Sequence, residues 1–222
     1  MFNFFNVDLS SLIANIPALL IGFAFHEFAH AWVADLLGDP TPRSQGRLTL
    51  NPFVHLDVFG SLMALLFRFG WAKPVMTNPS YFKGNPLRGR MLVALAGPVM
   101  NLLIAFLAMM LFLVTSILLP VPLWNQYNRV IQDIFMAIIL MNLGLGIFNL
   151  IPIPPLDGFA VLSGFLPARY ARYLWALESY GMLILALVLF TNVLGFVLSP
   201  LMSGLFNLYW NIGQLIFAPW LH

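Results

Sequence analysis

Long apolar runs separated by short polar segments extend along the chain, and they predict helices rather than alternating strands. A helix rises 1.5 Å per residue, so about 20 residues are needed to cross a hydrocarbon core of roughly 30 Å. Most of the runs reach that length easily, although proline and asparagine interrupt the last one. The expected spanning helices cover about 9–37, 89–119, 128–150, 173–198 and 200–219.

The remaining apolar run, 58–69, extends over only about 18 Å as a helix, which is too short to cross a bilayer. The basic residues lead to the same conclusion. If 58–69 does not cross, every lysine and arginine except Arg129 lies on one side of the membrane, and the positive-inside rule makes that side cytoplasmic. We therefore expect 58–69 to be re-entrant or interfacial, and the N-terminus to be extracytoplasmic.

The segment 71–82 has a different pattern, because aromatic, β-branched and proline residues are mixed in it. With Thr77-Asn78-Pro79 as a turn signal, it predicts a small β-hairpin at the cytoplasmic face. Proline confines such strands to sheet edges, so one edge is expected to stay open to a partner. The predicted fold class is an all-α polytopic membrane protein with about five transmembrane helices, one short re-entrant or interfacial helix and this hairpin. Residues 1–222 are expected to form a single integral-membrane domain.

The composition indicates whether this chain is surrounded by water or by lipid. Of its 222 residues, 61% are hydrophobic and 8% are charged, whereas a soluble domain carries roughly 25% charged residues. The chain cannot cover a water-facing surface, so its surroundings are expected to be a lipid bilayer. A net charge of +2 is too small to indicate a nucleic-acid partner, and the absence of cysteine excludes disulfides and thiolate metal sites.

The sequence HEFAH places three polar groups inside the first apolar run. On a helix, His26 and His30 lie about 40° apart on one face, with Glu27 on its flank. In an HExxH helix both imidazoles bind zinc, and the glutamate acts as general base on the metal-bound water. The alternative is a chance motif whose histidines hydrogen-bond between helices. However, these histidines lie roughly 20 and 14 Å from Asp39 at the helix end, a depth at which ionisable groups indicate function.

A zinc site of this type needs a third protein ligand. Leu36 excludes the longer HExxHxxGxxH motif, so the ligand must come from elsewhere in the chain. We favour Asp157, because it follows a proline-broken apolar segment, and irregular backbone at membrane depth is tolerated only where it lines a cavity. Asp57, just before 58–69, remains a rival. The acidic residues less suited by their position are Asp8, Asp35, Asp39, Asp133 and Glu178.

Two separated motifs now resemble a known family. HEFAH, together with the later N-x-x-P-x-x-x-x-D-G from Asn149 to Gly158, is similar to the site-2 protease family of intramembrane zinc metalloproteases. The stretch 97-GPVMN-101 resembles a further signature of that family. The resemblance covers about residues 10–165, the expected catalytic core, and leaves C-terminal helices over about 173–219. No PDZ or CBS module is recognisable, so the chain resembles a minimal member.

The resemblance implies an activity and a set of residue roles. It implies one zinc ion per chain held by His26, His30 and Asp157, with Glu27 activating water. It also implies cleavage of transmembrane protein substrates near the cytoplasmic face, as in regulated intramembrane proteolysis. The roles that it suggests for two further residues are contacts with the substrate backbone by Asn101 and Asn149; interhelical hydrogen bonding is the alternative for both.

Another histidine, His55, and a rival function also have to be considered. His55 is near 58–69 and is expected to be an interfacial histidine without a metal role. The rival function is a transporter or metal carrier, because broken helices and midplane polar groups also mark transport sites. A transport site has no evident need for Glu27 beside the ligands. The preferred prediction is therefore an intramembrane zinc endopeptidase in a prokaryotic plasma membrane, and an intact HExxH argues against an inactive scaffold.

Overall fold

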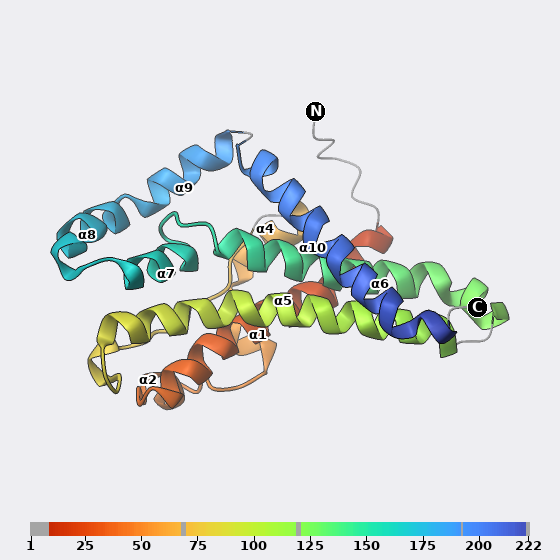
Figure 1. Cartoon of the computed structure of the whole chain (residues 1–222), viewed down its shortest axis with the longest axis horizontal. Coiled ribbons are helices and arrows are strands. Elements are labelled where there is room, and N and C mark those ends of the chain that lie inside the picture. The colour runs from red at the N-terminus through yellow and green to blue at the C-terminus, as the bar shows by residue number, and fades with distance from the viewer. Residues whose placement is uncertain (1–8, 68–69, 119–120, 192, 221–222) are drawn as a thin grey trace.

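The centre of the molecule is built from α1 (Leu9–Leu36), α5 (Pro86–Leu118) and α6 (Val121–Asn149). α5 and α6 run side by side along the long axis, and α1 packs against both (Figure 1). The computed structural model describes residues 9–67, 70–118, 121–191 and 193–220. These ranges are all-helical apart from their loops, and no strand forms in them.

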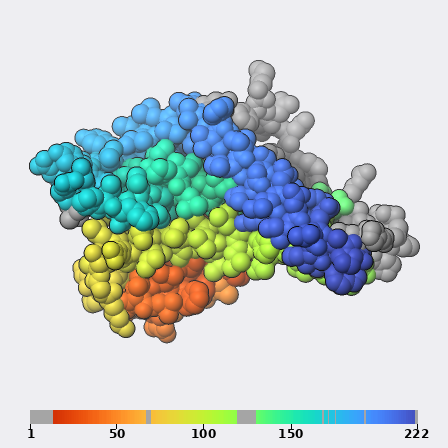
Figure 2. Space-filling view, in the orientation of Figure 1, coloured from red at the N-terminus to blue at the C-terminus, as the bar shows by residue number. Residues whose placement is uncertain are grey.

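Short helices fill the connections around this centre. Between α1 and α5 lie α2 (Thr41–Ser44), α3 (Pro52–His55), α4 (Val58–Phe67) and the 3-10 turn η1 (Pro79–Tyr81). After α6 come α7 (Asp157–Phe165), η2 (Ala168–Tyr170), α8 (Ala171–Ser179), α9 (Gly181–Phe190), α10 (Val193–Phe217) and η3 (Ala218–Trp220). We call α8, α9 and α10 the C-terminal arm. In the space-filling view the arm lies along one edge of the molecule, opposite the α1–α2 region (Figure 2).

The chain is an integral membrane protein with several membrane-spanning helices. Within the described ranges, 4 helices are long and apolar enough to cross a bilayer, and they are Ala14–Leu36, Pro86–Leu118, Val130–Asn149 and Val193–Trp220. The bent pair Arg172–Ser179 and Gly181–Phe190 raises the number to 5 if it is one span. α4, with 10 residues, is too short to cross, as its sequence predicts.

The predicted continuous helix over 173–198 is wrong. The chain instead forms α8 and α9, which meet at 58°, and α9 ends before α10 begins. At the bend Gly181 lies against Pro154, where a Cβ on the glycine would stand 3.0 Å from the proline Cβ. At the end of α9, Thr191 is extended and its hydroxyl donates to the Val188 carbonyl. Close packing at a glycine and a locally bonded threonine break a run that hydropathy alone would join.

The predicted hairpin over 71–82 is also absent, because this segment contains no strand. Its β-type pairing is limited to an isolated antiparallel bridge between Leu56 and Ala72. Pro74 and Pro79 lack an N–H, and other backbone groups of the segment bond to side chains from α1 and the following loop instead of to a second strand. We call residues 70–78 the strap.

The apolar core lies where α10 crosses the α5–α6 pair. Ala105, Ala108 and Met109 of α5 pack there against Ile139 and Leu143 of α6. Side chains of α10 cover this cluster, among them Met202, Leu205 and Phe206. A second cluster joins Leu19 and Phe23 of α1 to Ala64 of α4. These contacts hold α1, α5 and α6 at fixed positions, and the polar groups described next lie between them.

Candidate active site

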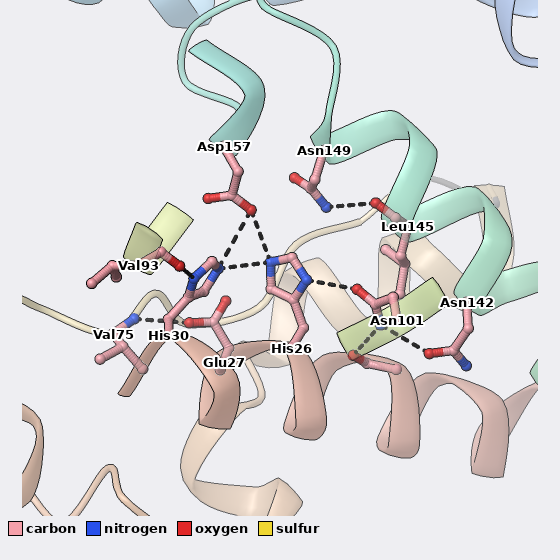
Figure 3. Close-up of polar contacts among 11 residues, drawn as sticks. His26, Glu27, His30, Val75, Val93, Asn101, Asn142, Leu145, Asn149 and Asp157 are labelled. Carbon is pink, nitrogen blue, oxygen red and sulfur yellow. Dashed lines mark hydrogen bonds and ion pairs between the residues drawn. The ribbon is translucent and has the colours of Figure 1, made fainter. Parts of the chain in front are cut away.

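The three predicted metal ligands converge on one point between α1 and α7 (Figure 3). The Nε2 atoms of His26 and His30 are 3.0 Å apart, and Asp157 Oδ2 lies 3.2 and 3.4 Å from them. Tetrahedral zinc with bonds of 2.0–2.1 Å would separate its ligand atoms by about 3.3 Å. The donor set and its spacing therefore suit one zinc ion.

Asp157 reaches this point because α6 stops at Asn149 and α7 starts afresh at Asp157. Prolines in the intervening segment prevent a continuous helix. Gly158 is needed at the turn, since a Cβ there would stand 2.2 Å from the Leu150 carbonyl oxygen. Asp157 Oδ2 is buried and forms no hydrogen bond; it faces only the two imidazole Nε2 atoms, at 3.2 and 3.4 Å, whereas a buried polar atom normally has a partner. A cation between the two imidazoles provides one.

The outer nitrogen of each imidazole has its own acceptor. His30 Nδ1 lies 2.7 Å from the Val93 carbonyl oxygen, and His26 Nδ1 lies 2.6 Å from Asn101 Oδ1. A carbonyl oxygen only accepts, so the Nδ1 of each ring carries the proton and Nε2 keeps a free lone pair. Metal-ligating histidines are commonly oriented in this way.

For Asn101, a substrate contact was one prediction and interhelical hydrogen bonding the alternative, and the structure shows interhelical hydrogen bonds. The Asn101 side chain is fully buried, and its amide is bonded to His26, to the Gly22 carbonyl and to Asn142. Asn149 does line the cavity, and its Nδ2 donates to the Leu145 carbonyl at 3.0 Å. The rival ligand Asp57 lies elsewhere and accepts from the Gly60 amide at the start of α4.

Gly97 makes room for both histidine rings. A Cβ at this position would stand 2.5 Å from His30 Nε2 and 2.6 Å from His26 Cε1. The stretch 97–101 therefore serves the site at both ends, with a glycine that admits the rings and an asparagine that bonds one of them. Sequence reasoning noticed this stretch only as a signature, because the rotation of α5 toward α1 is not visible in the sequence.

The carboxylate of Glu27 is held from the strap. Its Oε2 accepts from the Val75 backbone amide at 2.9 Å. Arg47 is buried and fixes the strap by donating to the carbonyls of Lys73 and Pro74, and to Val54. These contacts were not predicted, since no sequence motif marks an arginine that bonds backbone carbonyls.

Two neighbouring groups stay outside the metal cluster. His55 is buried with its Nε2 2.8 Å from the Thr49 carbonyl oxygen, and burial lowers the pKa of this histidine below its usual value. It is absent from the group of residues that can share a metal. Asp39 is also buried, and it accepts from the Asn78 amide at 2.6 Å and from Thr41. Both residues thus brace the strap and the loops beneath it.

The site opens into a cavity of about 700 Å³. HExxH and the strap line one part of it, Asn149 and the start of α7 line another, and Met182 and Leu185 reach in from the arm. An ion pair between Arg90 of α5 and Glu178 of α8 also borders it. A space of this size beside the ligands can admit an extended peptide segment.

Comparison with known proteins agrees with this geometry. The profile of Peptidase family M50 matches residues 14–127 and 122–191. The chain is 38% identical over 220 residues to the candidate zinc metalloprotease YwhC of Bacillus subtilis, covering 99% of each chain. It is 31% identical over 202 residues to Rip2 of Mycobacterium tuberculosis, another candidate zinc metalloprotease, covering 88% of this chain and 71% of that one. No solved structure matches the chain significantly.

Proposed function

The chain belongs to peptidase family M50, the site-2 proteases, and on that premise we propose that this membrane zinc metalloprotease binds its metal through His26, His30 and Asp157. The observation that carries the proposal is the convergence of the three ligand atoms within 4.8 Å. Zinc bound there supplies a Lewis acid that polarises the scissile carbonyl and lowers the pKa of water to about 7.

Glu27 is the general base of the proposed reaction. It takes a proton from the attacking water and passes it to the leaving amide nitrogen. The Val75 amide supports this role, because its hydrogen bond fixes the direction of the carboxylate beside the ligands. A transporter or metal carrier has no use for a base held in this way, and family membership favours the hydrolase.

The proposed substrates are transmembrane helices of membrane proteins. Inside a helix every backbone group is bonded internally, so the helix must unwind locally before water can reach a peptide bond. The strap is non-helical, lines the cavity wall and already pairs once, between Leu56 and Ala72. We propose that an unwound substrate segment adds to the strap as a strand, and that Asn149 bonds its backbone.

We also propose an orientation in a prokaryotic plasma membrane. The loop after α1 and the start of α5 lie together, since the Lys83 amide donates to the Leu37 carbonyl at 2.8 Å. This end of the bundle carries Arg43, Arg88 and Arg90, which the positive-inside rule places in the cytoplasm. The N-terminus is then extracytoplasmic and the catalytic site faces the cytoplasmic side. The whole chain, 1–222, acts as one domain.

A cleavage assay with metal control tests the proposed function. Purified protein in liposomes is incubated with a panel of transmembrane peptides, then with a zinc chelator, then with zinc restored. We expect peptide cleavage inside the hydrophobic segment, its loss with the chelator and its recovery with zinc. Cleavage that persists at full rate after the metal content has fallen to zero would contradict the proposal.

A further inference from the structure

A chain of buried amides extends from His26 into α6 (Figure 3). Asn101 Oδ1 lies 2.6 Å from His26 Nδ1, and Asn101 Nδ2 donates to Asn142 Oδ1 at 2.8 Å. Asn142 Nδ2 in turn donates to the Ile138 carbonyl at 2.9 Å. Both asparagine side chains are 0% exposed. This series of hydrogen bonds thus joins α1, α5 and α6 at the level of the ligands.

Every bond in this chain has one possible direction. The carbonyl of Ile138 can only accept, so the NH₂ group of Asn142 must face it and the Asn142 oxygen must face Asn101. The Gly22 carbonyl, 2.9 Å from Asn101 Nδ2, is likewise an acceptor. The Asn101 oxygen is left to face His26. The His26 Nδ1 must then carry the proton, and Nε2 is free to bind a metal.

The two ligand histidines differ in how this tautomer is enforced. His30 Nδ1 faces a backbone carbonyl, that of Val93, which cannot turn over. His26 Nδ1 faces a side-chain amide, which can rotate by half a turn. If Asn101 turned over, its oxygen would face the Gly22 and Asn142 oxygens, leaving the buried side-chain oxygens of Asn101 and Asn142 without donors at a cost of about 1–3 kcal/mol each. These two acceptors hold the Asn101 amide in its direction.

We infer that Asn142 is a positioning residue for His26 and acts through Asn101. It never touches the ligand, but from α6 it sets which face of the Asn101 amide the imidazole meets. Asn142 is 0% exposed, as are Ile139 and Leu143 on the same helix, and a buried amide is costly unless its hydrogen bonds are made. The inference rests on the proposed zinc site and adds the residue that selects the metal-binding tautomer of one ligand.

Zinc affinity measured by competition with a chromophoric chelator tests this role. Asn142→Leu removes one of the two acceptors that hold Asn101, and Asn101→Leu removes the acceptor of His26 itself. Loss of such an outer partner commonly weakens metal affinity by about 10–100-fold. We expect a loss of about tenfold for Asn142→Leu and of up to about a hundredfold for Asn101→Leu. Asn142→Ala, which adds no bulk, gives the same information if leucine is not tolerated.

The double variant distinguishes a role of Asn142 in positioning His26 from a purely stabilising hydrogen bond between helices. If Asn142 acts through Asn101, then Asn142→Leu has no further effect on zinc affinity in the Asn101→Leu background. An interhelical hydrogen bond without a positioning role would lower the thermal stability of the metal-free protein and leave zinc affinity unchanged. The visible spectrum of the Co²⁺-loaded protein gives an independent readout of the ligand field, which Asn142→Leu should alter.

The outcomes are distinguishable from those for the proposed function. A wild-type protein that binds no zinc overturns the zinc site and this inference together. A wild-type protein that binds zinc, with unchanged affinity in Asn142→Leu and Asn142→Ala, overturns the inference alone. Full additivity of the Asn142 and Asn101 losses also overturns it, because the two residues would then act on the metal independently.

Discussion

The catalytic bundle of α1, α5 and α6 differs sharply from the C-terminal arm in how it is packed. In α1, 56% of the most apolar window is buried inside the protein, and in α5 and α6 the share is 28%, against 6% in α10. A Cβ on Gly97 of α5 would stand 2.5 Å from His30 Nε2. Nothing lies within 4 Å of a Cβ on Gly204 of α10, although a Cβ on Gly213, later in the same helix, would stand 2.2 Å from Leu113 of α5. Most of α10 therefore faces away from the rest of the protein, and it packs closely only where it crosses α5 and α6.

The arm nevertheless completes the cavity. Met182 and Leu185 of α9 line it, and Glu178 of α8 reaches Arg90 of α5 across its edge. The proposed ligands and the proposed base, by contrast, come from α1 and from the start of α7. The difference indicates that the residues proposed for catalysis and the residues that border the entrance to the cavity lie on different helices. Changes in the bundle should affect the reaction itself, and changes in the arm should affect which substrates reach it.

The largest expected effect concerns the base in the bundle. Glu27→Gln keeps the hydrogen bond from the Val75 amide possible but cannot accept the proton of water. We expect zinc content to stay at the wild-type value and the cleavage rate to fall at least about a hundredfold. Metal analysis and cleavage of one transmembrane peptide measure the two quantities on the same sample. Near-normal cleavage would exclude Glu27 as general base.

A smaller but still large effect is expected from crowding the two histidines. Gly97→Ala places a methyl group against both rings, so we expect zinc affinity to fall by about 10–100-fold. The matched control is Gly204→Ala in the arm, where the added methyl group meets open space and favours the helix by roughly 1 kcal/mol. Zinc competition on both variants measures the contrast. Equal losses in the two would mean that close packing does not distinguish bundle from arm.

The same contrast separates what the sequence could predict from what it could not. The histidine pair depends only on the i, i+4 spacing of one helix, and Asp157 was recognisable because prolines break the helix before it. The bonds of His26 to Asn101, and of Asn101 to Asn142, depend on how three helices rotate about their axes. These helices are apolar on most faces, so their patterns do not show which face is buried.

Two errors have equally local causes. The sequence of 173–198 is predominantly apolar, and hydropathy does not register that Gly181 must fit against Pro154. The residues of 71–82 favour extended structure, and the strap is indeed non-helical before η1. However, the pattern cannot show that Arg47 and Glu27 would take its backbone groups in place of a second strand.

A further test moves from the enzyme to its substrate. If local unwinding limits cleavage, a substrate helix with Gly, Asn or Pro near its cytoplasmic third should be cut fastest. Gly costs about 1 kcal/mol of helix stability relative to Ala, and Pro about 3 kcal/mol. Replacing each breaker by leucine should slow cleavage by roughly tenfold per residue. Mass spectrometry of the products from a matched peptide series gives the rates, and an all-leucine helix that is cut equally fast would contradict unwinding.

The smallest expected effect belongs to the contact between arm and bundle. Arg90 and Glu178 form an ion pair whose side chains are 40% and 32% exposed, and partly exposed pairs contribute about 0.2–1 kcal/mol. If a transmembrane substrate must part the arm from the bundle, Arg90→Gln should raise its cleavage rate by about 1.5–5-fold. A short soluble peptide, which needs no such parting, should be cleaved at an unchanged rate.

A second ion pair provides the control that this small effect requires. Arg43 and Asp35 form a two-bond pair at the end of α1, and neither residue lines the cavity. Arg43→Gln removes the same charge and should leave the ratio of transmembrane to soluble cleavage unchanged. The exchange of Arg90→Glu with Glu178→Arg should return that ratio to the wild-type value, because it rebuilds the pair with its charges reversed. If Arg43→Gln shifts the ratio as much as Arg90→Gln does, the effect comes from net charge, and the arm does not control access through this contact.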